Sequence, residues 1–287
     1  MRAGRDRPRR PGLAARPGFA VAQSGFALAQ SGFAVAVMAF LVLPILAVLP
    51  ISLSAGSFLS YPLPGLSLQW YEKVFRPEPW MSALKNSLAI GGLTTLLATV
   101  LGTLAAIGLA KRIRFGKSLL LSLVLSPMIV PPIVYAVAIY FFFARFGLNA
   151  TYLGMVIAHT VLALPFVVVP VLATLSTFDQ TLVRAGASLG ASPLRVFRHV
   201  TLPNILPGVL TGAVFAFATS FDEVIVAIFV AGAEQQTLPR QMIEGIRDSI
   251  DPSILAISTV LIVFALLMMA ASLRLSRGRA PSRKSEI

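Results

Sequence analysis

Two adjacent carboxylates, Asp222 and Glu223, lie in the middle of a long apolar run of the sequence. Thr219 and Ser220 come shortly before them, so a short polar cluster interrupts side chains that are otherwise apolar. A charge at the centre of a bilayer costs roughly 2.5–3.5 kcal/mol, which argues against accidental placement. Because no Lys or Arg lies within the apolar segments defined below, the compensating cation must come from a partner subunit, the solvent or a substrate.

His159 is a further polar side chain that lies inside an apolar segment. We expect a buried neutral histidine that hydrogen-bonds to a neighbouring helix, with a substrate contact as the alternative. Ser220, Asp222 and His159 could also form the centre of an intramembrane enzyme, although no family spacing supports that arrangement. With 0 cysteines and 2 histidines, the chain has no thiol nucleophile and too few histidines for a histidine-built metal site. We therefore predict no metal and no cofactor.

Gly116-Lys117-Ser118 resembles the end of a phosphate-binding loop. Such a loop requires a glycine five positions before Gly116, where this sequence has Lys111, and it follows a strand of a parallel sheet. The chain is therefore not expected to be an enzyme, and any ATP hydrolysis must take place in another chain.

The composition is that of an integral membrane protein. Of 287 residues, 56% are hydrophobic and 12% are charged, and the mean hydropathy is +0.83. A water-soluble globule needs far more charge on its surface. Six segments provide the roughly 20 apolar residues that cross about 30 Å of hydrocarbon. They are 33–54, 87–110, 118–144, 153–175, 205–231 and 253–273.

The cations are distributed unevenly between the two sides of these segments. Six lie in the N-terminus, four in the 111–117 loop, three in the Arg184 loop and five in the C-terminal tail, which makes eighteen of the 24 Lys and Arg residues. The other six lie in the alternate loops. This positive-inside bias predicts that both termini and the Arg184 loop are cytoplasmic. The net charge of +13 is then explained by topology and by contact with lipid, and it requires no nucleic acid.

Both ends of the chain are basic. Residues 1–32 form an arginine-rich extension that contains a seven-residue echo of Gly-Phe-Ala, interpreted either as an amphipathic helix or as a low-complexity extension with a misassigned start. Residues 274–287 form a basic cytoplasmic tail. Within the third and fourth segments, Pro131, Pro165 and Pro170 predict bends, either as walls of a translocation path or as packing kinks.

The stretch from Arg184 to Pro203 is a polar, basic interruption between the fourth and fifth segments. Gly190 can end a first short helix by taking a positive φ, and Ser192 with Pro193 can begin a second one that Pro203 closes. Two short helices with arginines could be a DNA reader, but their place at a membrane surface disfavours a duplex as the ligand.

The spacing of this stretch resembles the signature of the type I membrane permeases of ABC importers. That signature is Glu-Ala-Ala, three residues, Gly, nine residues and Ile-x-Leu-Pro; here Arg184 replaces the Glu and Gly186 the second Ala. The resemblance implies that the cytoplasmic loop 176–204 contains a coupling helix that docks in a cleft of an ATPase. It also implies the coupling residues Arg184, Ala185, Gly186, Ser188, Leu189, Gly190, Ala191, Leu202 and Pro203.

A second set of motifs is similar to the second permease subunit of spermidine/putrescine-type importers. These are Ser-Phe-Asp-Glu-Val from Ser220, Phe-Val-Ala-Gly from Phe229, Thr-Leu-Pro from Thr237, a Trp-Tyr at Trp70, and Asn86-Ser87. The resemblance implies an all-α membrane fold with six transmembrane helices and a permease core over 81–273. It also implies four kinds of partner: a second permease, an ATPase dimer, an extracytoplasmic solute-binding protein and the lipid bilayer of the bacterial inner membrane.

The substrate implied is a polyamine or related cationic amine, with an opine, an amino-acid-like solute or an iron compound as alternatives. The expected substrate path consists of Asp222, Glu223, Ser220 and His159. A secondary transporter is disfavoured, because no internal repeat of the spans is visible and the coupling motif would have no purpose.

Overall fold

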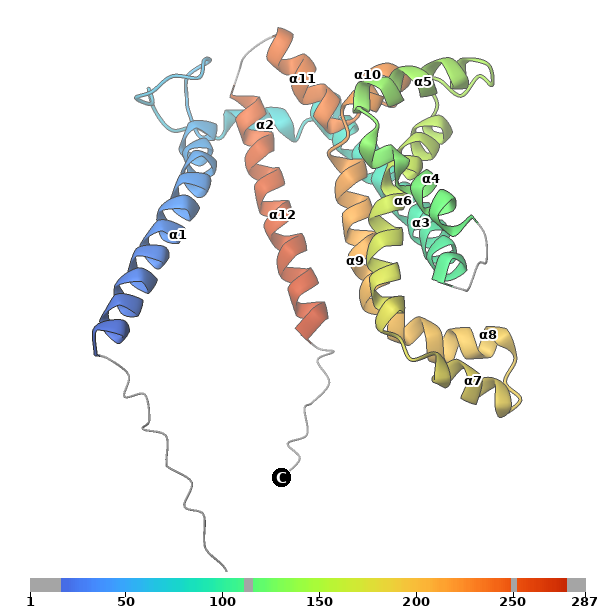
Figure 1. Cartoon of the computed structure of the whole chain (residues 1–287). Helices are drawn as coiled ribbons and strands as arrows, with labels where there is room; N and C mark the ends of the chain where they lie inside the picture. The colour runs from blue at the N-terminus through green and yellow to red at the C-terminus, as the bar shows by residue number, and fades with distance from the viewer. Residues whose placement is uncertain (1–16, 111–115, 249–251, 278–287) are drawn as a thin grey trace, which may run out of the picture.

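The computed structural model describes residues 17–110, 116–248 and 252–277, and these residues are almost entirely helical (Figure 1). The described ranges contain no β-strand beyond a single antiparallel bridge between Ser54 and Leu66. The helices are α1 (Pro17–Ser52), α2 (Gln69–Val74), the π-helical turn η1 (Pro77–Met81), α3 (Ser82–Ala110), α4 (Lys117–Ile129), α5 (Pro132–Ala144), α6 (Tyr152–Thr177), α7 (Gln180–Ser188), α8 (Pro193–Val196), the π-helical turn η2 (Phe197–Thr201), α9 (Leu202–Phe221), α10 (Ile225–Val230), α11 (Leu238–Asp248) and α12 (Ser253–Arg277).

Four of the described helical segments are long and apolar enough to cross a membrane: Gln30–Ser52, Pro79–Ala110, Tyr152–Thr177 and Pro193–Phe221. The pair α4 and α5 would add a fifth, although the two helices are bent by 105° relative to each other. The apolar part of α12 over the described side chains, Ser253–Leu267, is shorter than a full span. The membrane-spanning helical fold is therefore confirmed, whereas the number six stays a prediction.

The bend between α4 and α5 corrects the expectation of one continuous third span over 118–144. Val130 is extended, with φ −69° and ψ 129°, and Pro131 and Pro132 follow it. A residue before proline avoids the α-helical region, so two successive prolines end one helix and begin another. By contrast, Pro165 and Pro170 lie within the unbroken α6.

The N-terminal repeat and the first predicted span share one helix, and the part of it that is long and apolar enough to cross a membrane is Gln30–Ser52. α1 begins at Pro17 and runs through the predicted boundary at residue 32 without a break. Residues 1–16, the loop 111–115 and the end of the basic tail, 278–287, lie outside the described residues.

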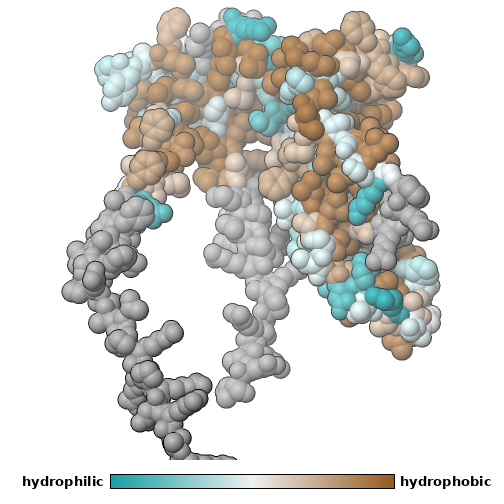
Figure 2. Space-filling view, in the orientation of Figure 1, coloured by the Kyte–Doolittle hydropathy of each residue, from teal (hydrophilic) through white to brown (hydrophobic). Residues whose placement is uncertain are grey.

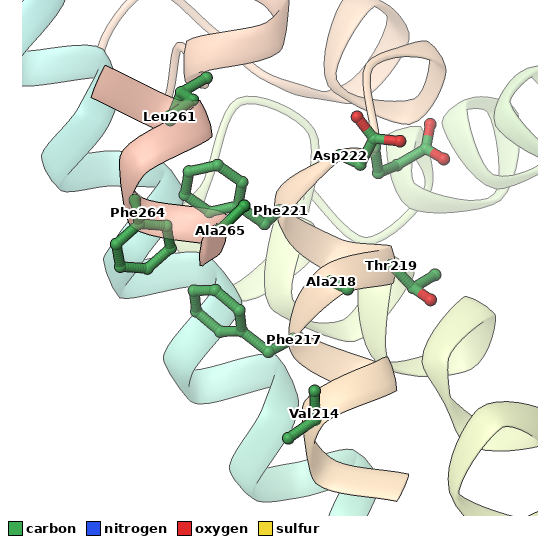
Figure 3. Close-up of a pocket in the computed structure, with 10 residues that line it drawn as sticks. Val214, Phe217, Ala218, Thr219, Phe221, Asp222, Leu261, Phe264 and Ala265 are labelled. Carbon is green, nitrogen blue, oxygen red and sulfur yellow. The ribbon is translucent and has the colours of Figure 1, made fainter. Parts of the chain in front are cut away.

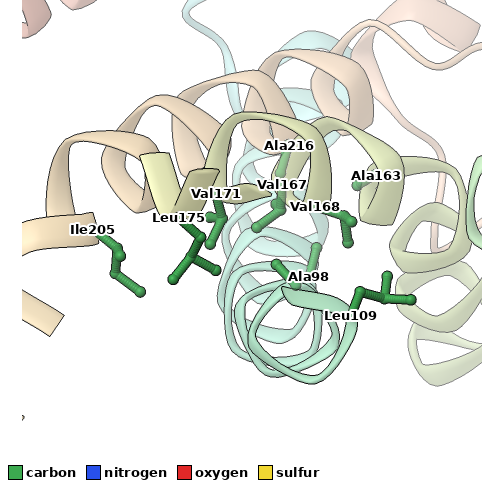
Figure 4. Close-up of a cluster of buried hydrophobic side chains, with 10 residues drawn as sticks. Ala98, Leu109, Ala163, Val167, Val168, Val171, Leu175, Ile205 and Ala216 are labelled. Carbon is green, nitrogen blue, oxygen red and sulfur yellow. The ribbon is translucent and has the colours of Figure 1, made fainter. Parts of the chain in front are cut away.

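α3, α6 and α9 form the central core of the described chain (Figure 4). Small residues let these helices approach closely, as in many membrane helix pairs. A Cβ added at Gly102 would lie 2.8 Å from Val167 Cβ, and one added at Gly212 would lie 2.9 Å from Val167 Cα. Val167 is fully buried between the two glycines. The core thus depends on the absence of side chains at these positions.

Gly208 offers a test of this packing. A Cβ there would lie 2.7 Å from the backbone oxygen of Pro170, which cannot move aside cheaply. We expect Gly208→Ala to lower the free energy of unfolding by about 1–3 kcal/mol. The control Gly92→Ala, where nothing lies within 4 Å, should be neutral or stabilising because alanine is the better helix former. Thermal unfolding of the purified protein in detergent compares them, and equal stability of the two variants would contradict the packing model.

Most of the shorter helices lie at the two ends of the molecule. α7 and α8 lie at one end, toward which the start of α1 and the end of α12 also point, and α2, α5, α10 and α11 lie at the other (Figure 1). We name these the α7 end and the α11 end. On the face shown in Figure 2, hydrophobic side chains cover most of the coloured surface, and hydrophilic ones gather at the α7 end and lie in separate patches elsewhere. This distribution suits a protein that crosses a bilayer.

Candidate functional site

The acidic pair lies at a break between α9 and α10, which corrects the expected continuous fifth span over 205–231. α9 ends at Phe221, Asp222 is its C-cap, and α10 begins only at Ile225. The side chain of Glu223 accepts a hydrogen bond from the backbone N–H of Val226, with Oε1 and N 2.7 Å apart. A helix N-terminus has unpaired N–H groups and favours a carboxylate, so Glu223 stabilises the start of α10.

An open cavity of about 830 Å³ lies beside this break (Figure 3). Asp222 is exposed and Glu223 is partly exposed. Phe217 stacks on Phe221, with 5.5 Å between the ring centroids, and Phe264 of α12 lies 6.0 Å from Phe221. In Figure 3 these rings face α12, whereas Asp222 and Thr219 point to another side of α9. The lining residues are Val214, Phe217, Ala218, Thr219, Phe221, Asp222, Glu223, Leu261, Phe264 and Ala265.

His159 and Ser220 are brought together by the structure, but they do not line this cavity. Nδ1 of His159 lies 2.8 Å from Oγ of Ser220, so α6 and α9 are joined by a buried hydrogen bond. The two residues are 1% and 5% exposed. The expectation of a buried histidine bonded to a neighbouring helix is therefore confirmed. Neither residue is among those that line this cavity, and their place on the substrate path stays a prediction.

No metal site accompanies these groups in the part of the chain that the structure describes, where no three His, Asp or Glu side chains gather closely enough to hold an ion. The polar groups that line the cavity are the carboxylates of Asp222 and Glu223 and the hydroxyl of Thr219.

The turn between α7 and α8 is the second candidate site. Gly190 has φ +78°, and two backbone hydrogen bonds close the end of α7: Gly190 N–H to Ala187 O at 3.0 Å, and Ala191 N–H to Gly186 O at 3.2 Å. This pair of bonds is the Schellman arrangement, which favours glycine at the left-handed position. The predicted end of the first helix at Gly190 is thereby confirmed.

Two leucines project from this turn. Leu189 is 88% exposed and Leu194 is 74% exposed, on either side of Gly190. Gly186 faces the buried Val196 of α8, and a Cβ added at Gly186 would lie 3.2 Å from Val196 Cγ2. The glycine that replaces the usual second Ala of the motif therefore lets α7 pack against α8. An exposed apolar apex on a rigid turn is suited to dock in a groove of another protein.

At its start, α7 is capped by Asp179. The carboxylate accepts a hydrogen bond from the backbone N–H of Thr181, with Oδ1 and N 2.8 Å apart. Hydrogen bonds from the side chain and the backbone of Thr181 lower the pKa of Asp179 below its ordinary value. The start of α7 is thus fixed by a charged cap, while its end is fixed by Gly190.

The expectation that Pro203 closes the second helix is wrong. The chain stays helical from Pro193 through η2 into α9, and Pro203 lies in the first turn of α9. Proline is tolerated there because the N–H groups of a first turn need no intrahelical partner, and the preceding π-helical turn absorbs the change of register. The turn between α7 and α8 is therefore joined by continuous helix to α9, which ends at Phe221.

Sequence reasoning missed α11 and its polar contacts. The Nδ2 of Asn86 donates to the carbonyl oxygens of Glu234 and Gln236, at 2.7 and 2.9 Å, and the backbone N–H of Leu238 donates to Ser87 Oγ at 2.8 Å. Asn86 and Ser87 thus tie the start of α3 to the segment that leads into α11. The amphipathic spacing of 238–248 was the available signal, but its many polar residues make it look like a loop.

Comparisons with known proteins agree with this architecture. Residues 98–280 match the family described as binding-protein-dependent transport system inner membrane component. The spermidine/putrescine transport system permease protein PotC of Haemophilus influenzae is 31% identical over 240 residues, which cover 83% of this chain and 92% of that protein. The putrescine transport system permease protein PotI of Escherichia coli is 29% identical over 230 residues, which cover 78% and 82%.

Among solved structures, a bacterial ABC transporter involved in the import of the acidic polysaccharide alginate has a similar chain. It aligns with a TM-score of 0.68 over 90% of this chain and 97% of that chain, at 13% sequence identity. At this identity the likeness shows the fold alone. The family match covers more than half of the 287 residues and therefore shows the family to which the chain belongs. The chain belongs to the binding-protein-dependent transport system inner membrane components, and is thus a multi-pass permease subunit of an ABC importer whose ATPase is a separate subunit.

Proposed function

We propose that this permease carries a polyamine such as spermidine or putrescine, or a related cationic amine, and that Asp222, with Glu223 beside it, attracts the cation at the cavity. The observation that carries the proposal is the joint lining of one cavity by two carboxylates and three phenylalanines. The names of the relatives support the same class, because PotC is a spermidine/putrescine permease and PotI a putrescine permease.

The carboxylates and aromatic rings of the cavity suit the ammonium and methylene groups of a polyamine. At 4 Å and an effective dielectric near 20, a carboxylate attracts an ammonium by about 4 kcal/mol. An aromatic face adds about 0.5–2 kcal/mol for a cation above it, and it also accepts methylene groups. Alternating ammonium and methylene groups therefore match the acidic and aromatic parts of the lining. Ser220 and His159 support the wall of the cavity from behind.

The turn between α7 and α8 is the proposed contact with the ATPase. Leu189 and Leu194 provide an apolar apex, and the Schellman turn at Gly190 fixes their relative direction. The continuous helical path from Pro193 to Phe221 would carry a movement of this apex to the acidic pair. The complete importer would contain a second permease, an ATPase dimer and an extracytoplasmic solute-binding protein.

Uptake by the reconstituted complex tests the proposed substrate. Vesicles that contain both permeases, the ATPase and the binding protein should accumulate labelled spermidine only with ATP. Unlabelled putrescine should compete, whereas an amino acid, an opine, an iron chelate and molybdate should not. If one of these other solutes competes with labelled spermidine and putrescine does not, the proposed substrate class is wrong.

We further propose that the α7 end is cytoplasmic and the α11 end extracytoplasmic, which follows from the distribution of the cations. Two exposed arginines at opposite ends of the molecule provide a matched test. Arg145 follows α5 at the α11 end, and Arg195 lies in α8 at the α7 end. Since the native chain has 0 cysteines, each can be replaced singly by cysteine without background. On intact spheroplasts, a membrane-impermeant maleimide should label Arg145→Cys and spare Arg195→Cys. The reverse pattern would invert the topology.

A further inference from the structure

We infer that Arg240 is a positioning residue that fixes α10 to α11, so that the α11 end and the Asp222–Glu223 break move as one unit. Arg240 lies in the first turn of α11, and its guanidinium reaches the last carbonyls of α10. Nη1 donates to the backbone oxygen of Ala231 at 2.7 Å and to that of Ala227 at 3.2 Å.

The same guanidinium is held in place from its own helix. Nε of Arg240 donates to Glu244 Oε1 at 2.8 Å, an i, i+4 ion pair whose side chains are 20% and 40% exposed. Gln236 donates to the other carboxylate oxygen of Glu244. Because the planar guanidinium has donors on several sides, it bonds at once to a carboxylate and to two carbonyls, which an ammonium cannot do in the same geometry.

α10 depends on contacts at its ends, because a helix of six residues is not stable alone. At its start, Glu223 accepts from Val226 N–H. At its end, Ala150 N–H donates to Val230 O at 2.8 Å, next to the two carbonyls that Arg240 holds. A cation at a helix C-terminus and a carboxylate at its N-terminus both have the favourable sign for the helix dipole. α10 is thus a short helix that is bonded to Arg240 at its C-terminal end and to Glu223 at its N-terminal end.

α11 is in turn tied to the core through Asn86 and Ser87 of α3. A displacement of α11 would therefore be transmitted through Arg240 to α10, and through α10 to Glu223 and Asp222. This inference extends the proposed function, because it gives the α11 end a means to act on the proposed cation site. The geometric link itself does not depend on which solute is carried.

The distance between α10 and α11 tests the link directly. Ile228 of α10 is 45% exposed and Ile246 of α11 is 48% exposed, so both can be replaced by cysteine and spin-labelled in the intact complex. Pulsed electron spin resonance should give one narrow distance distribution. Arg240→Gln should broaden it, whereas the matched control Arg247→Gln should not, because Arg247 is exposed in the same helix. Arg240→Lys should give an intermediate width.

Transport provides the second readout in the same variants. Spermidine uptake at equal abundance of the complex should fall at least about fivefold for Arg240→Gln, the lower range of coupling between sites. Uptake by Arg247→Gln should stay within about twofold of the wild type, as for most surface substitutions. Glu244→Gln should resemble Arg240→Lys, since it loosens the guanidinium without removing it.

Three outcomes would overturn the inference: an unchanged distance distribution in Arg240→Gln, equal effects of Arg240→Gln and Arg247→Gln, or a loss of uptake that only follows a loss of abundance. If the Arg240→Gln complex does not assemble, the distance distribution and the uptake of Arg240→Lys and Glu244→Gln test the inference instead. A wild-type complex that shows the narrow distribution but carries no polyamine would contradict the proposed substrate and leave the Arg240 link supported.

Discussion

Replacing Gly190 with valine is expected to uncouple ATP hydrolysis from transport while the spans stay intact. Gly190 has φ +78°, a conformation that costs a residue with a Cβ roughly 1–2 kcal/mol, and more if it is β-branched. No atom lies within 4 Å of a Cβ built at this position, so the penalty arises from the backbone and not from a clash. The turn should therefore open, and Leu189 and Leu194 should lose their fixed relative direction.

The measurement is ATP hydrolysis by the reconstituted complex, with and without the substrate-loaded binding protein. Stimulation should fall about tenfold or more in Gly190→Val, since roughly 1.4 kcal/mol corresponds to a factor of ten. Gly147→Val is the matched control, because Gly147 has φ +65° and equally open surroundings but lies in the loop after α5. Gly190→Asn should retain much of the stimulation, because asparagine tolerates the left-handed region. Wild-type stimulation in Gly190→Val would show that the bend is not the coupling element.

The parts of the fold that sequence reasoning found are those with a local signal. Gly190, Ser192 and Pro193 mark the end of one helix and the start of the next, and the structure has both there. The apolar length of α3 and α6 fixed these spans to within a few residues. Such features depend on the backbone preferences of single residues or on a long apolar run, so neither needs knowledge of the neighbouring helices.

The break at Asp222 was missed because neither Gly nor Pro marks it. A carboxylate three residues before Val226 is a recognisable start of a helix, but inside an apolar run it was interpreted as a charge within one span. The contacts that make the break stable come from remote residues, namely Ala150 and Arg240 at the far end of α10. The prediction that Pro203 closes the second helix was wrong because proline suits both the end and the first turn of a helix. Its own sequence does not tell the two apart.

The structure also separates two carboxylates that look equivalent in the sequence. Glu223 has a structural partner in Val226 N–H, whereas Asp222 is exposed at the cavity. Both line the cavity, but removal of the two charges should have different consequences. Glu223→Gln keeps an acceptor oxygen for the cap, and Asp222→Asn keeps the size of the side chain while removing its charge.

We expect Asp222→Asn to lower spermidine uptake about tenfold at unchanged abundance. An ammonium 4 Å from the carboxylate gains about 4 kcal/mol at an effective dielectric near 20, and water in the open cavity reduces this to a fraction. In Asp222→Asn the remaining carboxylate of the lining is that of Glu223, which is engaged by the N–H of Val226 at the start of α10. The proposal assigns the charge to passage of the cation, so it predicts a loss in the maximal rate more than in the concentration of half-maximal uptake.

Glu223→Gln is the companion variant, with a smaller expected loss because the cap at Val226 can persist with an amide oxygen. Thr219→Val, which removes a hydroxyl from the same lining, controls for a general change of the cavity surface. Uptake is compared with the amount of assembled complex in each variant. If Asp222→Asn imports spermidine and putrescine at the wild-type rate, the carboxylate does not act on the cation. A lower abundance that accounts for the whole loss would instead assign Asp222 to the end of α9, where its backbone N–H already bonds to Ala218 O.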